Sequence, residues 1–185
     1  MQVQSKPVLK GARVTLRAPQ PDDVAGRLAL GNSPELHRLF GGDPSQTRAL
    51  TEDAAQAWVD RLIGMDHGWV IEMDGRLIGS ISLHSLNLAD MRAQMAIGIL
   101  DESCLGQGLG SEAMRVLAAH AFGTMKLHRL SLRVLGFNAR AIAAYRKVGF
   151  REEGRERESA LIAGVWHDDI LMGLLSHELL DETRQ

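Results

Sequence analysis

The chain has 185 residues, 45% of them hydrophobic and 24% charged, and this length and balance predict one globular domain over residues 1–185. The net charge of −2 offers no basic face to nucleic acid, one cysteine excludes an intramolecular disulfide, and no apolar run reaches the roughly 18 residues of a membrane helix. We therefore expect a cytoplasmic protein with no nucleic-acid partner, membrane span, secretory leader or metal site.

The first third of the chain predicts one strand followed by helices. Residues 12–18 alternate as a strand does, and Pro19 ends it because proline has no N–H for a ladder. An aspartate can then cap a helix over about residues 23–31, a second short helix is expected near residues 35–40, and a longer helix opens at Thr51. The apolar stripe expected on that third helix consists of Ala54, Ala57, Trp58 and Leu62.

The middle of the chain predicts a β-hairpin. The segments 68–73 and 76–84 flank Asp74-Gly75, a dipeptide that favours a tight two-residue turn. Residues 85–91 are expected to form a loop and residues 92–100 a buried strand. The hairpin and this strand would form the centre of the sheet.

A glycine-rich turn follows that strand. Gly106, Gly108 and Gly110 alternate, and a helical pattern begins directly behind them. Glycines let a backbone approach a ligand closely, and the N–H groups at a helix start attract anions, so a phosphate-bearing cofactor is our first hypothesis. No lysine follows, as an NTPase loop requires, and Ser111 stands where a dinucleotide fingerprint has its third glycine. A simple tight loop is the alternative interpretation.

The last third predicts a second helix between strands. The helix behind the turn places Ala113, Met114, Leu117, Ala118 and Ala121 at helical spacing. A strand over 130–135 precedes a helix over 138–148, which ends at Gly149-Phe150, and two strands near 150–157 and 164–174 complete the chain. Parallel and antiparallel pairs are both required, so we expect a mixed sheet.

The order of these two units resembles the GNAT superfamily, the GCN5-related N-acetyltransferases. Its marks here are the glycine turn, Asn138, Tyr145 and Gly149-Phe150. Residues 15–17, with the Pro-Asp-Asp that follows, resemble the start of the ribosomal-protein N-acetyltransferase branch. The resemblance implies an α/β (α+β) GNAT fold, with a mixed, mostly antiparallel central sheet of about six to seven strands and helices on both faces.

The resemblance also implies acetyl-CoA as co-substrate and direct transfer of its acetyl group, in a ternary complex, to a primary amine of a protein N-terminus or a small molecule. A module of the same fold that binds acyl-CoA without turnover is the alternative, and a plain nucleotide-binding protein is a third interpretation. The residues implied for the cofactor are Ile97, Ile99 and Leu100 on the strand, Leu105, Gly106, Gln107, Gly108, Leu109, Gly110 and Ser111 at the turn, and Asn138 and Lys147 on the later helix.

Two of these positions carry qualifications. The family usually has glutamine or arginine just before the turn, where this chain has Cys104 and Leu105, so the phosphate contact would depend on backbone N–H groups. Asn138 can be a helix cap, a cofactor contact or both.

Acetyl transfer needs an unprotonated amine, donors for the thioester oxygen, and an acid for the leaving thiolate. The resemblance assigns the acid to Tyr145, the only tyrosine; a half-buried packing residue is the alternative. No base is assigned, because Arg133 and Gln94 stand where relatives carry glutamate. Glu72, His84 and a water relay remain candidates.

Three further expectations concern the surroundings of the site. An acyl-enzyme on Cys104 is disfavoured because no partner histidine accompanies it. Asp168 and Asp169 could attract a cationic acceptor or be solvated surface. Residues 170–175 form an apolar run with a candidate free edge, which predicts a homodimer through the C-terminal strands.

Overall fold

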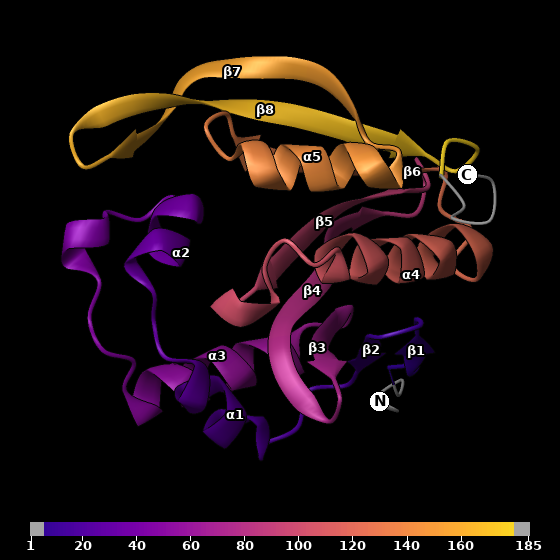
Figure 1. Ribbon diagram of the computed structural model, residues 1–185. Coiled ribbons are helices and arrows are strands. Elements are labelled where there is room, and N and C mark those ends of the chain that lie inside the picture. The colour runs from indigo at the N-terminus through magenta and orange to yellow at the C-terminus, as the bar shows by residue number, and fades with distance from the viewer. Residues whose placement is uncertain (1–5, 180–185) are drawn as a thin grey trace.

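The structure is a computed structural model and describes residues 6–179. In chain order its elements are β1 (Leu9–Lys10), β2 (Thr15–Arg17), α1 (Asp23–Leu30), α2 (Pro34–Leu39), the 3₁₀ turn η1 (Pro44–Gln46), α3 (Glu52–Gly64), β3 (Gly68–Met73), β4 (Arg76–Asn87), β5 (Arg92–Ile99), the 3₁₀ turn η2 (Glu102–Cys104), α4 (Leu109–Gly123), β6 (Arg129–Leu135), α5 (Ala139–Val148), β7 (Arg151–Ile162) and β8 (Val165–Leu175). Figure 1 shows their arrangement.

Eight strands form one twisted sheet in the order β1-β2-β3-β4-β5-β6-β8-β7. Between described strands every pairing is antiparallel except that of β5 with β6. The α/β class and the mixed sheet are thus confirmed. One strand more than the upper expected number is present, because the two-residue strand β1 is too short to give a periodic sequence signal.

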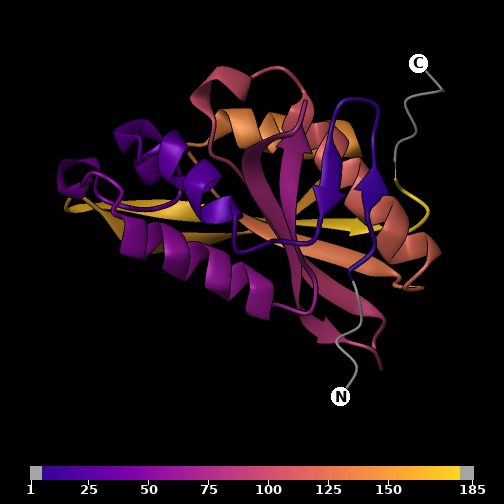
Figure 2. The same ribbon diagram turned by 90° about the horizontal axis from the view of Figure 1, so that it is seen from below.

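Helices cover both faces of the sheet, as predicted (Figures 1 and 2). On one face, Leu62 of α3 packs with Val70 and Leu77 of the central hairpin. On the other, α4 and α5 pack over a larger core, and the helical stripe of α4 is buried as expected: Ala113, Met114, Leu117, Ala118 and Ala121. None of the helices within residues 6–179 is long and apolar enough to span a membrane.

The predicted central hairpin is confirmed, and its turn explains the choice of residues. Asp74 and Gly75 both have positive φ, 50° and 75°, which is the backbone that a two-residue hairpin turn requires. The strand after the turn, however, extends to Asn87, so the loop expected over 85–91 is shorter than predicted.

The stripe predicted for α3 is wrong at two positions. Ala54 and Ala57 are exposed, whereas Ala55 and Val59 are completely buried together with Leu62. Alanine fits either side of a helix, so the spacing of alanines alone does not show which side faces the sheet.

The free edge expected for residues 170–175 is also wrong. They belong to β8, which pairs with β6 on one side and β7 on the other. The true edge is β7, whose sequence REEGRERESALI is mostly charged and exposed. Because β8 is paired on both sides, a dimer through strand addition at residues 170–175 is excluded. The charged edge strand β7 discourages pairing with another chain.

Candidate active site

The site begins where β5 and β6 separate. These parallel strands pair at only three positions, from Arg92 with Arg129 to Gln94 with Ser131. Beyond that point β5 continues along β4 to Ile99, while β6 continues along β8 to Leu135. The two strands therefore diverge and leave a gap in the middle of the sheet.

The separation leaves backbone donors on one side of β5. The N–H of Leu100 donates to the carbonyl oxygen of Ile78 at 2.7 Å, toward β4. Because the direction of N–H groups alternates along a strand, those of Ile97 and Ile99 point the other way, toward the gap. These two groups, rather than Leu100, are placed to hold a ligand in the gap.

The glycine turn lies at the end of β5. Gly106 and Gly108 have φ of 76° and 80°, a conformation that other residues seldom adopt, so glycine is required there. Gly108 caps α4, and the N–H groups of the first turn of that helix have no carbonyl partner within it. Gly110 has an ordinary backbone, and a Cβ there would make ordinary contacts with Ile99 at 3.6 Å and Ile97 at 4.0 Å, so the structure does not require glycine at this position.

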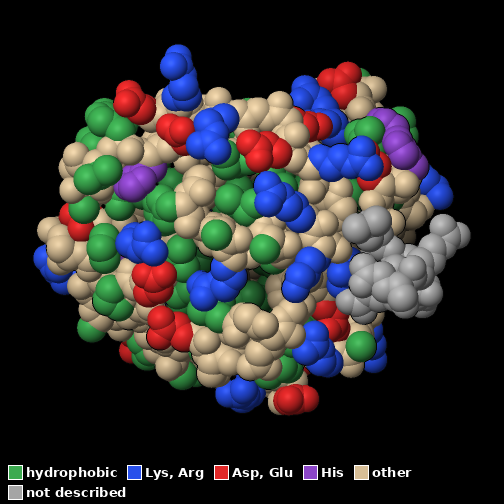
Figure 3. Space-filling view, turned by 45° about the horizontal axis from the view of Figure 1, so that its top comes forward, with side chains coloured by type: hydrophobic (Ala, Val, Ile, Leu, Met, Phe, Trp, Pro, Cys, Tyr) green, Lys and Arg blue, Asp and Glu red, His purple; other side chains and the backbone are tan. Residues whose placement is uncertain are grey.

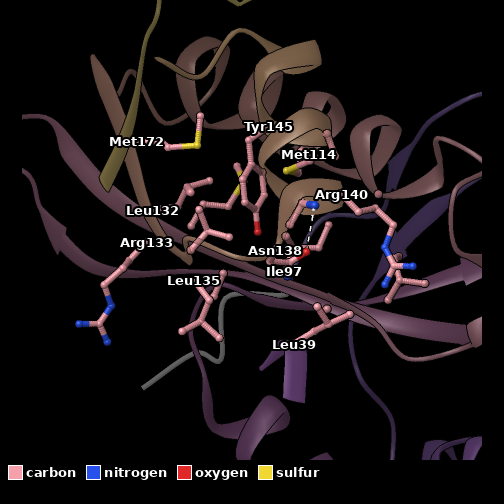
Figure 4. Close-up of a pocket in the computed structure, with 18 of the residues that line it drawn as sticks. Leu39, Ile97, Met114, Leu132, Arg133, Leu135, Asn138, Arg140, Tyr145 and Met172 are labelled. Carbon is pink, nitrogen blue, oxygen red and sulfur yellow. Dashed lines mark hydrogen bonds between the residues drawn. The ribbon is translucent and has the colours of Figure 1, made fainter. Parts of the chain in front are cut away.

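Helix α5 brings the second set of predicted residues to the gap. Asn138 caps the helix, its Oδ1 accepting from the N–H of Ala141 at 3.1 Å, while the residue also lines the cavity described below. Tyr145 points from α5 into that cavity (Figure 4), and its ring packs edge-on against Phe150. Burial raises the pKa of Tyr145 to about 12, so its hydroxyl stays protonated at neutral pH.

A cavity of about 1220 Å³ runs through the gap. Its lining includes Ser111, Met114 and Tyr145 from the face covered by α4 and α5, and Arg133 and Phe40 from the opposite face. Figure 3 shows apolar side chains in a hollow surrounded by charged ones. A cavity lined from both faces lets a ligand on one side meet a second ligand on the other.

The cavity gathers most of the residues predicted for the cofactor. Those that line it are Ile97, Ile99, Leu105, Gly106, Gly108, Leu109, Gly110, Ser111, Asn138 and Lys147, together with Tyr145. Leu100 and Gln107 lie outside the lining. The side chain of Gln107 instead donates to the carbonyl oxygen of Ser103 at 2.6 Å, which helps to hold the turn.

The far wall of the cavity carries paired charges. Arg129 donates to Glu153 at 2.6 Å, and Arg133 lies 3.3 Å from the carboxylate of Asp169 and 3.4 Å from that of Glu156. Each carboxylate on this wall therefore has a guanidinium partner. Arg133 is shared by two of these carboxylates, so three carboxylates face two guanidiniums and the wall keeps one negative charge in excess.

The two neighbouring aspartates of the last strand differ. Asp168 points outward, where it pairs with Arg155 at 3.0 Å and accepts from the N–H of Glu158. Asp169 is only 5% exposed, lines the cavity and accepts from the hydroxyl of Ser159 at 2.8 Å. Because side chains alternate along a strand, the two carboxylates lie on opposite faces of the sheet. The sequence alone did not show which of the two faces the cavity.

The structure leaves fewer candidates for the general base that accepts the proton of the amine. Glu72 on β3 is in an ion pair with Arg17 at 2.5 Å and does not line the cavity. His84 does line it, opposite Gln94 in the β4–β5 register. Cys104 also lines it, but burial raises the pKa of its thiol, which disfavours the thiolate needed for a covalent route. His84 and water remain.

Sequence reasoning missed several residues at the site. Leu36 and Leu39 of α2 line the cavity together with Phe40, the C-cap of that helix, which is 55% exposed. Their helical spacing was visible, but nothing in it indicated a cavity wall. Arg13 and Glu112, beside the glycine turn, were also missed. A glutamate in the first turn of an anion-binding helix was the available signal, because such a charge needs a nearby cation.

Comparisons with known proteins agree with this geometry. Residues 13–151 match the profile of the acetyltransferase (GNAT) domain. YdaF of Bacillus subtilis (strain 168), provisionally named as a ribosomal N-acetyltransferase, is 31% identical over 89% of this chain and 92% of its own length. Spermidine N(1)-acetyltransferase of Escherichia coli (strain K12) is 32% identical over 91% and 89%. RimJ of Mycobacterium smegmatis, solved with CoA-disulfide, has a similar fold, with a TM-score of 0.76, 22% identity, and coverage of 95% of this chain and 90% of its own.

Proposed function

The chain belongs to the GNAT acetyltransferase family and transfers an acetyl group from acetyl-CoA to an amine, and we propose that its two substrates meet in the gap between β5 and β6. The observation that carries this proposal is the cavity lined from both faces of the sheet. Acetyl-CoA enters on the side of α4 and α5, and the acceptor on the side of α2 and β8.

Backbone groups hold the cofactor in this proposal. The diphosphate lies at the start of α4, where N–H groups and the helix dipole favour an anion. The pantetheine arm runs along β5, and the N–H groups of Ile97 and Ile99 face it. Asn138 contacts the same arm while capping α5, and Lys147 lies where it can meet a phosphate.

The chemistry then proceeds by direct attack. The lone pair of the amine attacks the thioester carbonyl carbon, a backbone N–H of β5 stabilises the oxyanion, and the C–S bond breaks as the amide forms. Tyr145 donates its hydroxyl proton in a hydrogen bond to the departing sulfur. That proton passes to the sulfur as CoA leaves as a thiol, and the proton lost by the amine passes to water or to His84, so that Tyr145 is reprotonated from solvent and the protons balance.

We propose that the acceptor is the α-amine of a peptide or protein N-terminus. With each carboxylate in an ion pair and one negative charge in excess, the far wall is not the strongly acidic site that a polyamine with several positive charges favours. An α-amine has a pKa near 7.8 and a lysine-like amine near 10.4, so the unprotonated fraction at pH 7 differs roughly 300-fold. An α-amine therefore reacts without a strong base, and within residues 6–179 the cavity offers only His84 or an already paired carboxylate for that role.

An amine panel tests this choice. Thiol release from acetyl-CoA is measured with short peptides of varied first residue, their N-terminally blocked forms, spermidine and a lysine analogue. We expect kcat/KM for at least one free peptide to exceed that for spermidine by about 100-fold or more near pH 7, in line with the amine pKa values. A preference for spermidine would contradict the proposed acceptor, and binding of acetyl-CoA without release on any amine would favour the non-catalytic alternative.

We also propose that residues 1–185 form a single domain in the cytoplasm, with no metal, membrane or nucleic acid involved.

We propose in addition that the protein forms a homodimer. The dimer contact would use the exposed tip of the β7–β8 hairpin, where Leu161, Val165 and Trp166 are each 55–56% exposed. Sedimentation that gives only a 20.3 kDa species at about tens of micromolar would contradict the dimer.

A further inference from the structure

A buried carboxylate lies beside the proposed diphosphate site. Glu112 is the fourth residue of α4 and is 9% exposed. It accepts hydrogen bonds from the N–H groups of Arg13 and Val14 at 2.6 and 3.1 Å, and from the Arg13 Nε at 3.0 Å. Burial alone would raise its pKa, but these donors outweigh burial and hold the pKa of Glu112 below its usual value. Glu112 is therefore ionised at neutral pH.

The negative charge of Glu112 works against the binding of a diphosphate at the start of α4. A negative side chain in the first turn already uses the favourable field of the helix dipole, and it repels a second anion placed there. The turn cannot offset the repulsion itself, since residues 101–111, DESCLGQGLGS, contain no lysine or arginine.

Arg13 supplies the missing positive charge from a distant part of the chain. It lies between β1 and β2, 99 residues before Glu112. Its Nη1 donates to the carbonyl oxygen of Gln107 at 3.0 Å, and its Nη2 lies 3.5 Å from the position that a Cβ on Gly108 would occupy. The side chain remains 51% exposed. One guanidinium thus contacts both Glu112 and the glycine turn.

The space around this pair is tightly filled. A Cβ on Gly11 would lie 2.5 Å from Glu112 Oε1, so a larger residue there would displace the carboxylate from its present position. The carboxylate then accepts from two consecutive backbone N–H groups. This arrangement orients Arg13 toward the turn rather than toward solvent.

We propose that Arg13 is a positioning residue for the diphosphate of acetyl-CoA. It cancels the charge of Glu112 and holds the Gln107 carbonyl on the back of the turn, so that the N–H groups face the ligand. Arg13 thereby takes over the charge that relatives provide at the places held here by Cys104 and Leu105. The inference depends on the proposed function, in which the diphosphate lies at this turn.

The test compares two acetyl donors in the full-length protein. Acetyl-CoA carries the diphosphate, and S-acetylpantetheine has the same thioester and arm without any phosphate. For Arg13→Gln we expect the KM for acetyl-CoA to rise about 10-fold or more, as loss of a close charge predicts, and the rise to shrink with added salt. With S-acetylpantetheine, kcat/KM should stay within about twofold of the wild type, because that donor has no charge for Arg13 to compensate.

Three further variants separate the effect of charge from the effect of structure. Glu112→Gln retains an oxygen that accepts from the two N–H groups but removes the charge, so its KM for acetyl-CoA should be equal to or lower than that of the wild type. In the double variant Arg13→Gln/Glu112→Gln, most of the lost affinity should return. Arg13→Lys keeps the charge but not both contacts, so its KM for acetyl-CoA should lie between those of the wild type and Arg13→Gln. Circular dichroism and the unfolding temperature check that each variant is folded.

Several results would overturn the inference. Equal losses with both donors, or a double variant worse than Arg13→Gln alone, would give the pair a structural role only. An Arg13→Gln protein that does not fold leaves the decision to Glu112→Gln, where a raised KM for acetyl-CoA would contradict charge compensation. If the wild type uses both donors equally well and Gly108→Val leaves acetyl-CoA binding unchanged, the diphosphate does not lie at this turn, and the proposed site itself fails.

Discussion

The two halves of the cavity are built in different ways. The cofactor half consists of β5, the glycine turn, α4 and α5, and most of its proposed contacts are backbone N–H groups within residues 97–111. The acceptor half consists of α2, which ends at Leu39, and the opposite face of β6, β7 and β8, the first of which begins only at Arg129, so side chains from distant segments line it. A constant cofactor suits a backbone site, whereas a variable acceptor suits a wall whose side chains can be exchanged.

The largest expected effect breaks the cofactor half. Gly108→Val should raise the Kd for acetyl-CoA at least about 100-fold, because a branched side chain is strained at φ of 80° and blocks approach to the N–H groups. Isothermal titration measures the change. Gly164→Val is the matched control, since Gly164 has the same φ of 80° but lies in the β7–β8 turn. Equal acetyl-CoA affinity in a folded Gly108→Val protein would remove the turn from the site.

The next effect concerns the point where the halves meet. Tyr145→Phe should lower kcat roughly 10- to 100-fold and leave the KM for acetyl-CoA nearly unchanged, because general acid catalysis is lost while the ring stays packed on Phe150. A thiolate with pKa near 8.5 already leaves fairly well, which places the effect at the low end of acid catalysis. Single-turnover kinetics must show that chemistry limits the rate. Wild-type kcat under that condition would make Tyr145 a packing residue.

The pH profile sharpens the same prediction. Since burial raises the pKa of Tyr145 to about 12, its proton is present throughout the range from pH 6 to about pH 10, and kcat/KM should show no falling limb there. The rising limb should follow the acceptor amine instead. A falling limb near pH 8–10 in the wild type that disappears in Tyr145→Phe would contradict the raised pKa.

A smaller effect is expected in the acceptor half alone. Asp169→Asn leaves Arg133 with one carboxylate partner fewer inside the cavity, so kcat/KM for a peptide acceptor should fall about 10-fold, as for loss of a close charge pair. The Kd for acetyl-CoA should change by less than about twofold, because Asp169 pairs with Arg133 and is not among the proposed cofactor contacts. Asp168→Asn is the control on the outer face of the same strand. A similar loss of cofactor affinity in Asp169→Asn would show that the halves are not separate.

The smallest effect tests the contact that joins the halves. The hydroxyl of Ser33 accepts from the N–H of Leu36 at the start of α2 and donates to Glu102, just before the glycine turn. Ser33→Ala should cost about 1 kcal/mol of unfolding free energy through the lost cap. Calorimetry should show this as a fall of roughly 2–4 °C in the unfolding temperature. A larger fall, together with a raised KM for acetyl-CoA, would mean that α2 also supports the cofactor half.

The sequence by itself determined the local elements of the cofactor half. Strand, turn and helix there are consecutive in the chain, and each has a local cause: an apolar run, glycines at positive φ, and a helical stripe that begins at Leu109. Helix α5 was predicted in the same way, from Asn138, Tyr145 and Gly149. The resemblance of these units and their order to the GNAT superfamily then implied the fold, acetyl-CoA and amine acetylation.

The tertiary structure alone decided what depends on distant segments. Residues 170–175 are inner rather than edge because β7 returns along β8, and Asp169 is buried because the register with Leu135 turns it into the cavity. Glu72 is excluded as a base by Arg17, and Arg13 reaches the glycine turn across 94 residues. Periodicity reports which residues share a face of one element. It does not report which face meets which neighbour, because that is fixed by packing between elements that are far apart in the chain.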